Sequence, residues 1–170
     1  MTDIREAVKE AYGAAIERKT VCCGFDTVCC GSEDDITDMT KGNYDVAATD
    51  ATPSDIVGQS FGCGNPIQAA LLKEGERVLD LGSGAGLDLI LAAKAVTQTG
   101  HVYGLDMTPA MLNRARKNID RLGLKNVSLL RGYIEDLPLH DGSVDVLISN
   151  CVINLSPDEV TANDEVSLPN

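Results

Sequence analysis

Short, continuous apolar runs recur along the central part of the chain, and each is bounded by glycine or by polar residues. Runs of this kind are typical of parallel strands buried on both faces, whereas half-exposed strands alternate between apolar and polar positions. We therefore predict four strands, at residues 77–81, 101–106, 127–131 and 144–150.

Between these runs, apolar residues recur three or four positions apart, which predicts helices. One helix should run from Gly86 to Val96, and a second should begin at Thr108-Pro109 and stop at Gly123. One face of the second helix carries Met111, Ala115, Ile119 and Leu122. Strands that alternate with helices predict an α/β fold, a parallel sheet with helices on both faces.

The N-terminal part, residues 1–52, differs from this pattern. Thr2 to Lys19 has helical spacing, which predicts an amphipathic helix that lies on the domain as a lid or brace. From Thr20 to Thr49 the periodicity is lost, and the cysteine pairs Cys22-Cys23 and Cys29-Cys30 occur there. We expect this segment to be a mobile arm with one short helical turn.

Residues 53–158 should form the domain that contains the sheet. Two short helices are predicted before its first strand, one at Pro53–Val57 and one that Pro66 opens, that continues through Leu72 and that Gly75 ends. Residues 159–170 are acidic and lack the periodicity of a helix leading to another strand, so we interpret them as an atypical tail.

A glycine-rich turn, Asp80 to Gly86, follows the first predicted strand. Glycine is needed where a turn requires backbone angles that a side chain would block, and where backbone approaches a ligand at a helix N-terminus. Leu87 occupies the last glycine position of a dinucleotide fingerprint, which disfavours a pyrophosphate ligand. Asp106 ends the second strand, where it can accept hydrogen bonds from a ribose. The alternative is a nucleotide-free core that uses the glycines only to turn.

Composition limits the partners. The formal net charge of -12 at pH 7 disfavours nucleic acid and anionic membranes, because both need a basic face. No run approaches the roughly 18 apolar residues of a membrane span, and the chain starts with charges in place of an apolar signal segment. We therefore expect a cytoplasmic protein. There its six cysteines should be mainly reduced, which favours metal, metalloid or transient redox chemistry over a disulfide framework.

Several motifs, taken in order, resemble those of class I S-adenosyl-L-methionine (SAM)-dependent methyltransferases and, among them, arsenite methyltransferases. They are the Tyr-Gly of the first helix and the segments 60–66 (SFGCGNP), 80–88, 104–108 (GLDMT), 132–135 (GYIE) and 149–155 (SNCVINL). The resemblance covers about residues 4 to 158. It implies a Rossmann-like parallel sheet of order 3-2-1-4 and methylation of trivalent arsenic from SAM, which is arsenic detoxification.

The resemblance also implies the SAM-binding residues. Asp106 would hold the ribose, Ile134 and Glu135 would flank the adenine, and Asn150 and Gly84 would line the methionine end. The other implied cofactor residues are Asp80, Gly82, Ser83, Gly86 and Met107. Ligands of open parallel sheets bind at the carboxyl ends of the strands, near the point where strand order reverses. For Glu135 the alternative is an acid in a solvated loop.

The cysteines suggest the acceptor. Soft thiolates select thiophilic ions, and three of them suit a trivalent metalloid whose lone pair stays exposed. By the resemblance, Cys63 and Cys151 bind arsenic(III), and one member of the arm pairs, such as Cys22 or Cys23, joins disulfide exchange during turnover. The alternative for Cys151 is a small buried hydrophobe. The substrate would be arsenite or its thiol conjugates, with glutathione or thioredoxin as reductant.

The sequence also departs from the family, which has a further cysteine and more strands after the fourth strand. We therefore expect an incomplete sheet. Two other functions stay open. One is a small-molecule C- or O-methyltransferase of the quinone or sterol type, which would not need Cys63 and Cys151 in these places. The other is a truncated, non-catalytic fragment that binds SAM or thiophilic ions without turnover.

Overall fold

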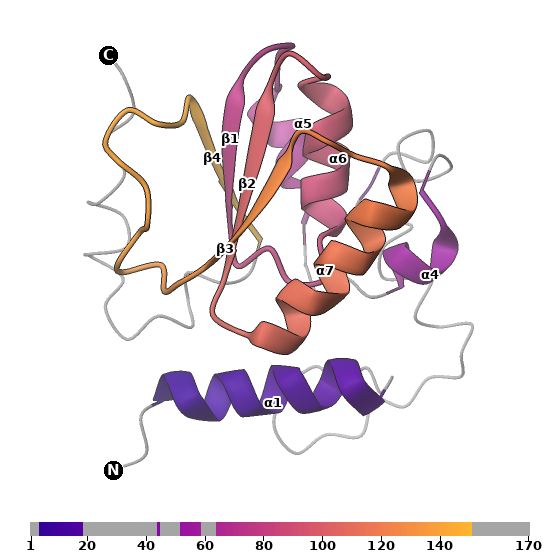
Figure 1. Ribbon diagram of the computed structural model, residues 1–170, viewed down its shortest axis with the longest axis vertical. Coiled ribbons are helices and arrows are strands. Elements are labelled where there is room, and N and C mark those ends of the chain that lie inside the picture. The colour runs from indigo at the N-terminus through magenta and orange to yellow at the C-terminus, as the bar shows by residue number, and fades with distance from the viewer. Residues whose placement is uncertain (1–3, 19–43, 45–51, 59–63, 151–170) are drawn as a thin grey trace.

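The computed structural model describes residues 4–18, 44, 52–58 and 64–150, and its centre is a four-stranded parallel sheet (Figure 1). The strands are β1 (Arg77–Leu81), β2 (His101–Asp106), β3 (Val127–Arg131) and β4 (Val146–Ser149), in the order β3-β2-β1-β4. This order confirms the expected one. It also places the reversal of strand order between β1 and β4, where a ligand site is expected.

Three of the strands have the predicted bounds, but β4 is shorter than predicted. Its ladder with β1 begins at the pair Val78 and Val146 and ends at Leu81 and Ser149. Val144, predicted as the first residue of the strand, is instead buried against Leu79 in the connection that precedes β4. An apolar residue in a covering loop and one in a strand look alike in a sequence, which explains the error.

Helices cover one face of this sheet (Figure 1). They are α4 (Ser54–Val57), α5 (Pro66–Ala70), α6 (Leu87–Ala95) and α7 (Pro109–Leu122). Right-handed crossovers explain this, because the chain moves in one direction from β1 to β2 to β3 and so places α6 and α7 on the same side. The connection to β4 runs back across the other face. There, among the described residues, the segment 132–145 covers the sheet in place of the helices predicted for that side.

The two longer helices follow their sequence patterns. Residues 87–93 of α6 are all buried, as expected for a helix that is apolar all round, since it lies between the sheet and neighbouring helices. In α7, Met111, Ala115 and Ile119 are buried, and the helix ends at Gly123 in the left-handed conformation, as predicted. The larger of the two core clusters therefore lies between the sheet and α6, and the smaller lies on the other face of the sheet.

The N-terminal helix and α5 differ in how well the sequence predicted them. The predicted N-terminal helix is α1 (Ile4–Arg18), and it packs against α7 beside the edge where the strands end (Figure 1). The prediction for α5 was wrong at its end, because the helix stops at Ala70 and Leu71 adopts a left-handed conformation. Gly75 belongs to a separate turn before β1. The expected arm at 20–49 lies outside the described residues, apart from Tyr44.

Candidate functional site

The glycine turn lies at the carboxyl end of β1 and is fastened to β2. The backbone N–H groups of Gly82 and Ser83 donate to the carbonyl of Leu105, at 2.8 and 3.0 Å. Gly84 and Gly86 have φ angles of 53° and 91°, which other residues rarely adopt. The predicted turn is therefore present, and its backbone conformation explains the residue type.

The two later glycines of the turn serve different purposes. A Cβ on Gly86 would lie 3.2 Å from the Cβ of Ala115, so its absence lets α7 approach the start of α6. A Cβ on Gly84 would meet only the carbonyl oxygen of Gly82, at 4.0 Å, so the backbone there is open on that side. An open glycine backbone at the N-terminal end of a buried helix suits a ligand that must come close to the main chain.

Asp106 stands beside this opening with its carboxylate held in place. Its Oδ2 accepts from the N–H of Gly84 at 2.9 Å, and its Oδ1 accepts from the N–H of Thr108 at 2.7 Å. Burial raises the pKa of Asp106, and these two hydrogen bonds oppose the shift. Each carboxylate oxygen can accept a second hydrogen bond, so a fixed Asp106 still has acceptors for ribose hydroxyls. The half-buried Met107 follows it directly.

Asp80, inside β1, is the most buried acid of the site. It is 2% exposed, and its Oδ2 has no hydrogen-bond partner among the described residues. Burial raises its pKa well above the usual value, and the nearby Asp88 and Asp106 carboxylates raise it further. The hydroxyls of Ser83 and Ser149 are likewise buried and without a partner in the described part of the chain. Such atoms are rare in native proteins and indicate unused hydrogen-bonding capacity. Ser149 was not predicted as a site residue.

Asn150 follows β4 and joins several segments that are distant in the sequence. Its Nδ2 lies 3.1 Å from Oδ2 of Asp88, at the start of α6, and 3.0 Å from the carbonyl of Gly64. Its Oδ1 accepts from the N–H of Gly64 at 3.2 Å, and the Tyr44 hydroxyl donates to Oδ1 of Asp88 at 2.9 Å. Burial raises the pKa of Asp88, while the hydrogen bonds from Asn150 and Tyr44 oppose it.

Sequence reasoning missed two members of this group. Asp88 stood within a motif segment but received no role, although an acid in an otherwise apolar first helical turn was a visible signal. Tyr44 lies in a segment without periodicity, so nothing in its neighbourhood pointed to burial. In the structure Tyr44 is 4% exposed. The hydrogen bonds of Tyr44 are made with residues far away in the sequence, Asp88 and Asn150.

The segment predicted to flank the adenine has its two residues in different environments. The side chain of Ile134 is buried with Leu79 and Leu105 beneath the sheet. Only its backbone therefore remains to flank a ligand. Glu135 is half-buried, and its neighbours Tyr133 and Asp136 form an isolated bridge that tightens the turn. The side chain of Ile134 thus holds this loop to the core.

All six cysteines, including the predicted arsenic ligands Cys63 and Cys151 and the arm residues Cys22 and Cys23, lie outside the described residues. Among the residues that are described, no group of three or more His, Cys, Asp or Glu side chains could hold a metal ion. Within the same residues, no helix has both the length and the apolar character that crossing a membrane requires.

Comparison with known proteins adds independent findings. A family model described as "Methyltransferase domain" matches residues 72–167. The arsenite methyltransferase of Halobacterium salinarum is 41% identical over 170 residues, which is 96% of this chain and 43% of that protein. The arsenite methyltransferase of Aquipseudomonas alcaligenes is 50% identical over 106 residues, 58% of this chain and 30% of that protein. The chain thus spans less than half the length of these curated relatives.

Solved structures give the same picture. An arsenic (III) S-adenosylmethionine methyltransferase from Chlamydomonas reinhardtii is similar with a TM-score of 0.65 and 45% identity, over 72% of this chain and 44% of that one. A SAM-dependent methyltransferase from Aquifex aeolicus is similar with a TM-score of 0.56 and 28% identity, over 82% of this chain and 69% of that one. Both likenesses support a methyltransferase fold for the described residues.

Proposed function

The chain belongs to the methyltransferase-domain family, and on that premise we propose that it transfers a methyl group from SAM to trivalent arsenic held by cysteine thiolates. The observation that carries the proposal is the arrangement at the carboxyl edge of the sheet. An open glycine turn lies between Asp80 and Asp106, and Asn150, which follows β4, forms hydrogen bonds with Gly64. The relatives named arsenite methyltransferases supply the choice of acceptor.

The residues of the turn fit SAM. Asp106 would accept hydrogen bonds from the ribose hydroxyls, and the open backbone at Gly84 would let the ligand approach the main chain. The unpartnered Oδ2 of Asp80 would accept from a cationic group. The other proposed contacts are Gly82, Ser83, Gly86, Met107, Glu135, Asn150 and the backbone of Ile134. When bound, SAM supplies an electrophilic methyl group that a lone pair can attack in line.

We place the arsenic on Cys63 and Cys151. The support is local, because Gly64 and Asn150 are joined by two hydrogen bonds and each is the covalent neighbour of one of these cysteines. Consecutive Cα atoms are about 3.8 Å apart, so each cysteine is one residue step from this hydrogen-bonded pair. Cys22 or Cys23 would exchange disulfides with them, and glutathione or thioredoxin would return the thiols to the reduced form.

A methylation assay tests the proposal. Purified protein is incubated with SAM, arsenite and glutathione, and the methylated arsenicals are separated and quantified. Cys63→Ser and Cys151→Ser should each sharply lower arsenite affinity while S-adenosylhomocysteine affinity stays nearly unchanged. Cys29→Ser is the matched control, because it removes a thiol from the arm only. Wild-type arsenite binding by both core variants would contradict the assignment, and SAM binding without methylated arsenicals would favour a non-catalytic fragment.

A further inference from the structure

A polar network joins four segments of the chain at the edge that carries the proposed arsenic site. Its members are Tyr44, Gly64, Asp88 and Asn150, which are 44 to 106 residues apart in the pairs that bond. Tyr44 and Asp88 are 4% and 7% exposed. Hydrogen bonds in such a place are shielded from competing water, so each contributes more to geometry than a surface bond would.

The donors and acceptors of the network fix the orientation of the Asn150 amide. The N–H of Gly64 requires an acceptor, which is Oδ1 of Asn150 at 3.2 Å. The carbonyl of Gly64 and the carboxylate of Asp88 require a donor, which is Nδ2 of Asn150 at 3.0 and 3.1 Å. A flipped amide would face acceptor with acceptor and donor with donor. The Asn150 amide therefore satisfies both backbone groups of Gly64 in one orientation only.

Asp88 in turn is held from two sides. The Tyr44 hydroxyl donates to its Oδ1 at 2.9 Å, and Asn150 donates to its Oδ2. The residue stands in the first turn of α6, the helix that begins directly after the glycine turn. The network thus fixes Gly64 and Asn150 relative to the buried helix α6.

We propose that Asp88 and Tyr44 are positioning residues that hold Asn150 against Gly64, and that this arrangement favours the binding of one trivalent arsenic by Cys63 and Cys151. The inference rests on the proposed function. It adds two residues to which neither the sequence motifs nor the relatives assign a role. If the network served only folding, its loss would lower stability and leave arsenite affinity unchanged in the folded protein.

The first test removes one hydroxyl. Tyr44→Phe keeps the ring and deletes both the hydrogen bond that the hydroxyl donates to Asp88 and the one that it accepts from Asn150. Tyr103→Phe, on the opposite face of the sheet, is the matched control. By calorimetry with sodium arsenite, Tyr44→Phe should lower affinity about tenfold, as expected for a hydrogen bond to a charged group, and Tyr103→Phe should not. Affinity for S-adenosylhomocysteine should change less than about twofold in both. Equal arsenite affinity in the two variants overturns the proposal.

The second test exchanges the acid and the amide. Asn150→Asp sets a second carboxylate against Asp88 and against the Gly64 carbonyl, so arsenite affinity should fall by more than about tenfold. The double variant Asp88→Asn/Asn150→Asp restores a donor facing an acceptor between the two positions and keeps an acceptor for the Gly64 N–H. Affinity should recover at least in part. A double variant no better than Asn150→Asp alone would contradict positioning through Asn150.

The two tests separate this inference from the function on which it rests. If wild-type protein binds no arsenite, or binds it equally after Cys63→Ser and Cys151→Ser, the proposed function fails. If binding depends on these cysteines but is unaffected by Tyr44→Phe and Asn150→Asp, only the positioning role fails. Thermal melts of each variant identify the folded fraction, so that affinity is compared between folded proteins.

Discussion

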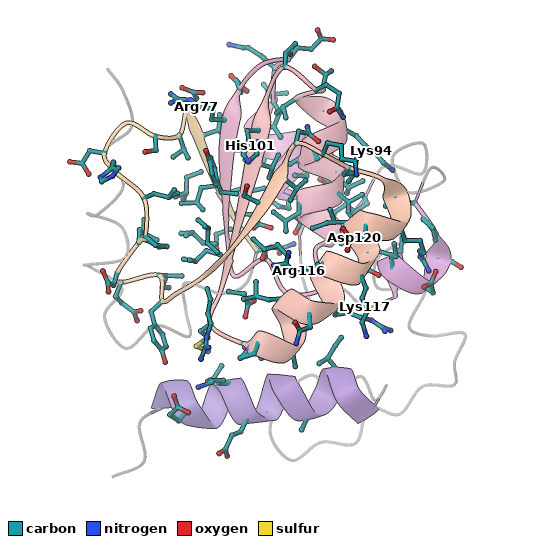
Figure 2. The ribbon with its side chains drawn as sticks, viewed as in Figure 1. Arg77, Lys94, His101, Arg116, Lys117 and Asp120 are labelled. Atoms are coloured by element: carbon teal, nitrogen blue, oxygen red, sulfur yellow. The ribbon has the colours of Figure 1, made fainter. Side chains whose placement is uncertain are left out.

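At the amino ends of β1 and β4, the Asp145 carboxylate receives three hydrogen bonds from Arg77, one from the backbone N–H and two from the guanidinium. Arg77 is labelled at that end of the sheet in Figure 2. At the carboxyl ends of the same strands, Asp80 is buried and keeps one oxygen without a partner in the described residues. Two aspartates at opposite ends of one sheet therefore have opposite environments.

Their pKa values shift in opposite directions for that reason. The hydrogen bonds and charge of Arg77 lower the pKa of Asp145 to about 2. Burial, together with the charges of Asp88 and Asp106, raises the pKa of Asp80 well above its usual value. The charged form is favoured at the amino end and disfavoured at the carboxyl end.

The difference supports the proposal that the amino end of the sheet is structural and that the carboxyl end is functional. A satisfied ion pair needs nothing more, whereas clustered buried acids with unused oxygens lower stability unless a ligand uses them. Proteins keep such local conflicts mainly where function requires them. This contrast supports the candidate site at the carboxyl edge of the sheet, and the following predictions test it.

The largest expected effect comes from Gly100, just before β2 at the structural end. A Cβ there would lie 2.5 Å from the carbonyl oxygen of Glu76 and 2.6 Å from the Cβ of Val96, and neither atom can move without shifting backbone. Gly100→Ala should lower the free energy of unfolding in urea by about 3 kcal/mol. In Gly142→Ala, where nothing lies within 4 Å and only the positive φ opposes the change, the loss should be about 1 kcal/mol. Equal losses would contradict the packing argument.

The next effect concerns the functional end. Asp106→Ala should weaken the binding of S-adenosylhomocysteine by about 1 to 3 kcal/mol, the cost of losing hydrogen bonds to a charged group. The exposed Asp141→Ala is the control and should bind as the wild type does. Titration calorimetry measures both. Unchanged affinity in a folded Asp106→Ala protein would contradict the prediction that Asp106 binds the ribose.

A gain of stability is expected when the conflict at Asp80 is removed. Its pKa is higher in the folded than in the unfolded chain, so its destabilising contribution appears as the pH rises above the ordinary value of 3.8. Asp80→Asn, which cannot ionise, should therefore raise the free energy of unfolding at pH 8 by about 1 to 2 kcal/mol. The gain should shrink toward pH 4. Urea titrations at the two pH values measure it, and lower stability of the variant at pH 8 would refute the argument.

The local sequence signals predicted most of the fold. The bounds of β1, β2 and β3 followed from apolar runs, and the stop of α7 followed from Gly123. Tertiary packing decided what the sequence could not. Leu71 turns the chain in a left-handed conformation that leucine rarely adopts, and the residue is 78% exposed, while Ala70 and Leu72 pack on the core.

The site was predictable only as far as it follows the strand ends. Asp80, Asp106 and Asn150 come at or after strand termini, and parallel strands bring those termini to one edge. The bonds of Tyr44 and Asp88 could not be read in the same way, because they join segments with no shared local pattern. Long-range polar contacts depend on the final packing of the helices on the sheet.

The smallest effect should have the opposite sign to that of Asp80→Asn. The pKa of Asp145 is lower in the folded chain than in the unfolded chain, so its ionised carboxylate stabilises the folded state at pH values above 3.8. This contribution is lost as the pH falls from 3.8 to about 2. Asp145→Asn should therefore lower the urea midpoint at pH 7 and have little effect at pH 2. The side chains of Arg77 and Asp145 are 42% and 32% exposed, so solvent and salt weaken the pair.

Asp55→Asn, in the more exposed pair with Arg121, is the control and should change the midpoint less. Added salt should reduce the Asp145→Asn effect at pH 7, because the pair is partly exposed. The same exchange of aspartate for asparagine would then destabilise the protein at one end of the sheet and stabilise it at the other. If both substitutions shifted the midpoint at pH 7 in the same direction, the two ends would not differ in the way that the hydrogen bonds of Asp145 and the unpartnered oxygen of Asp80 require.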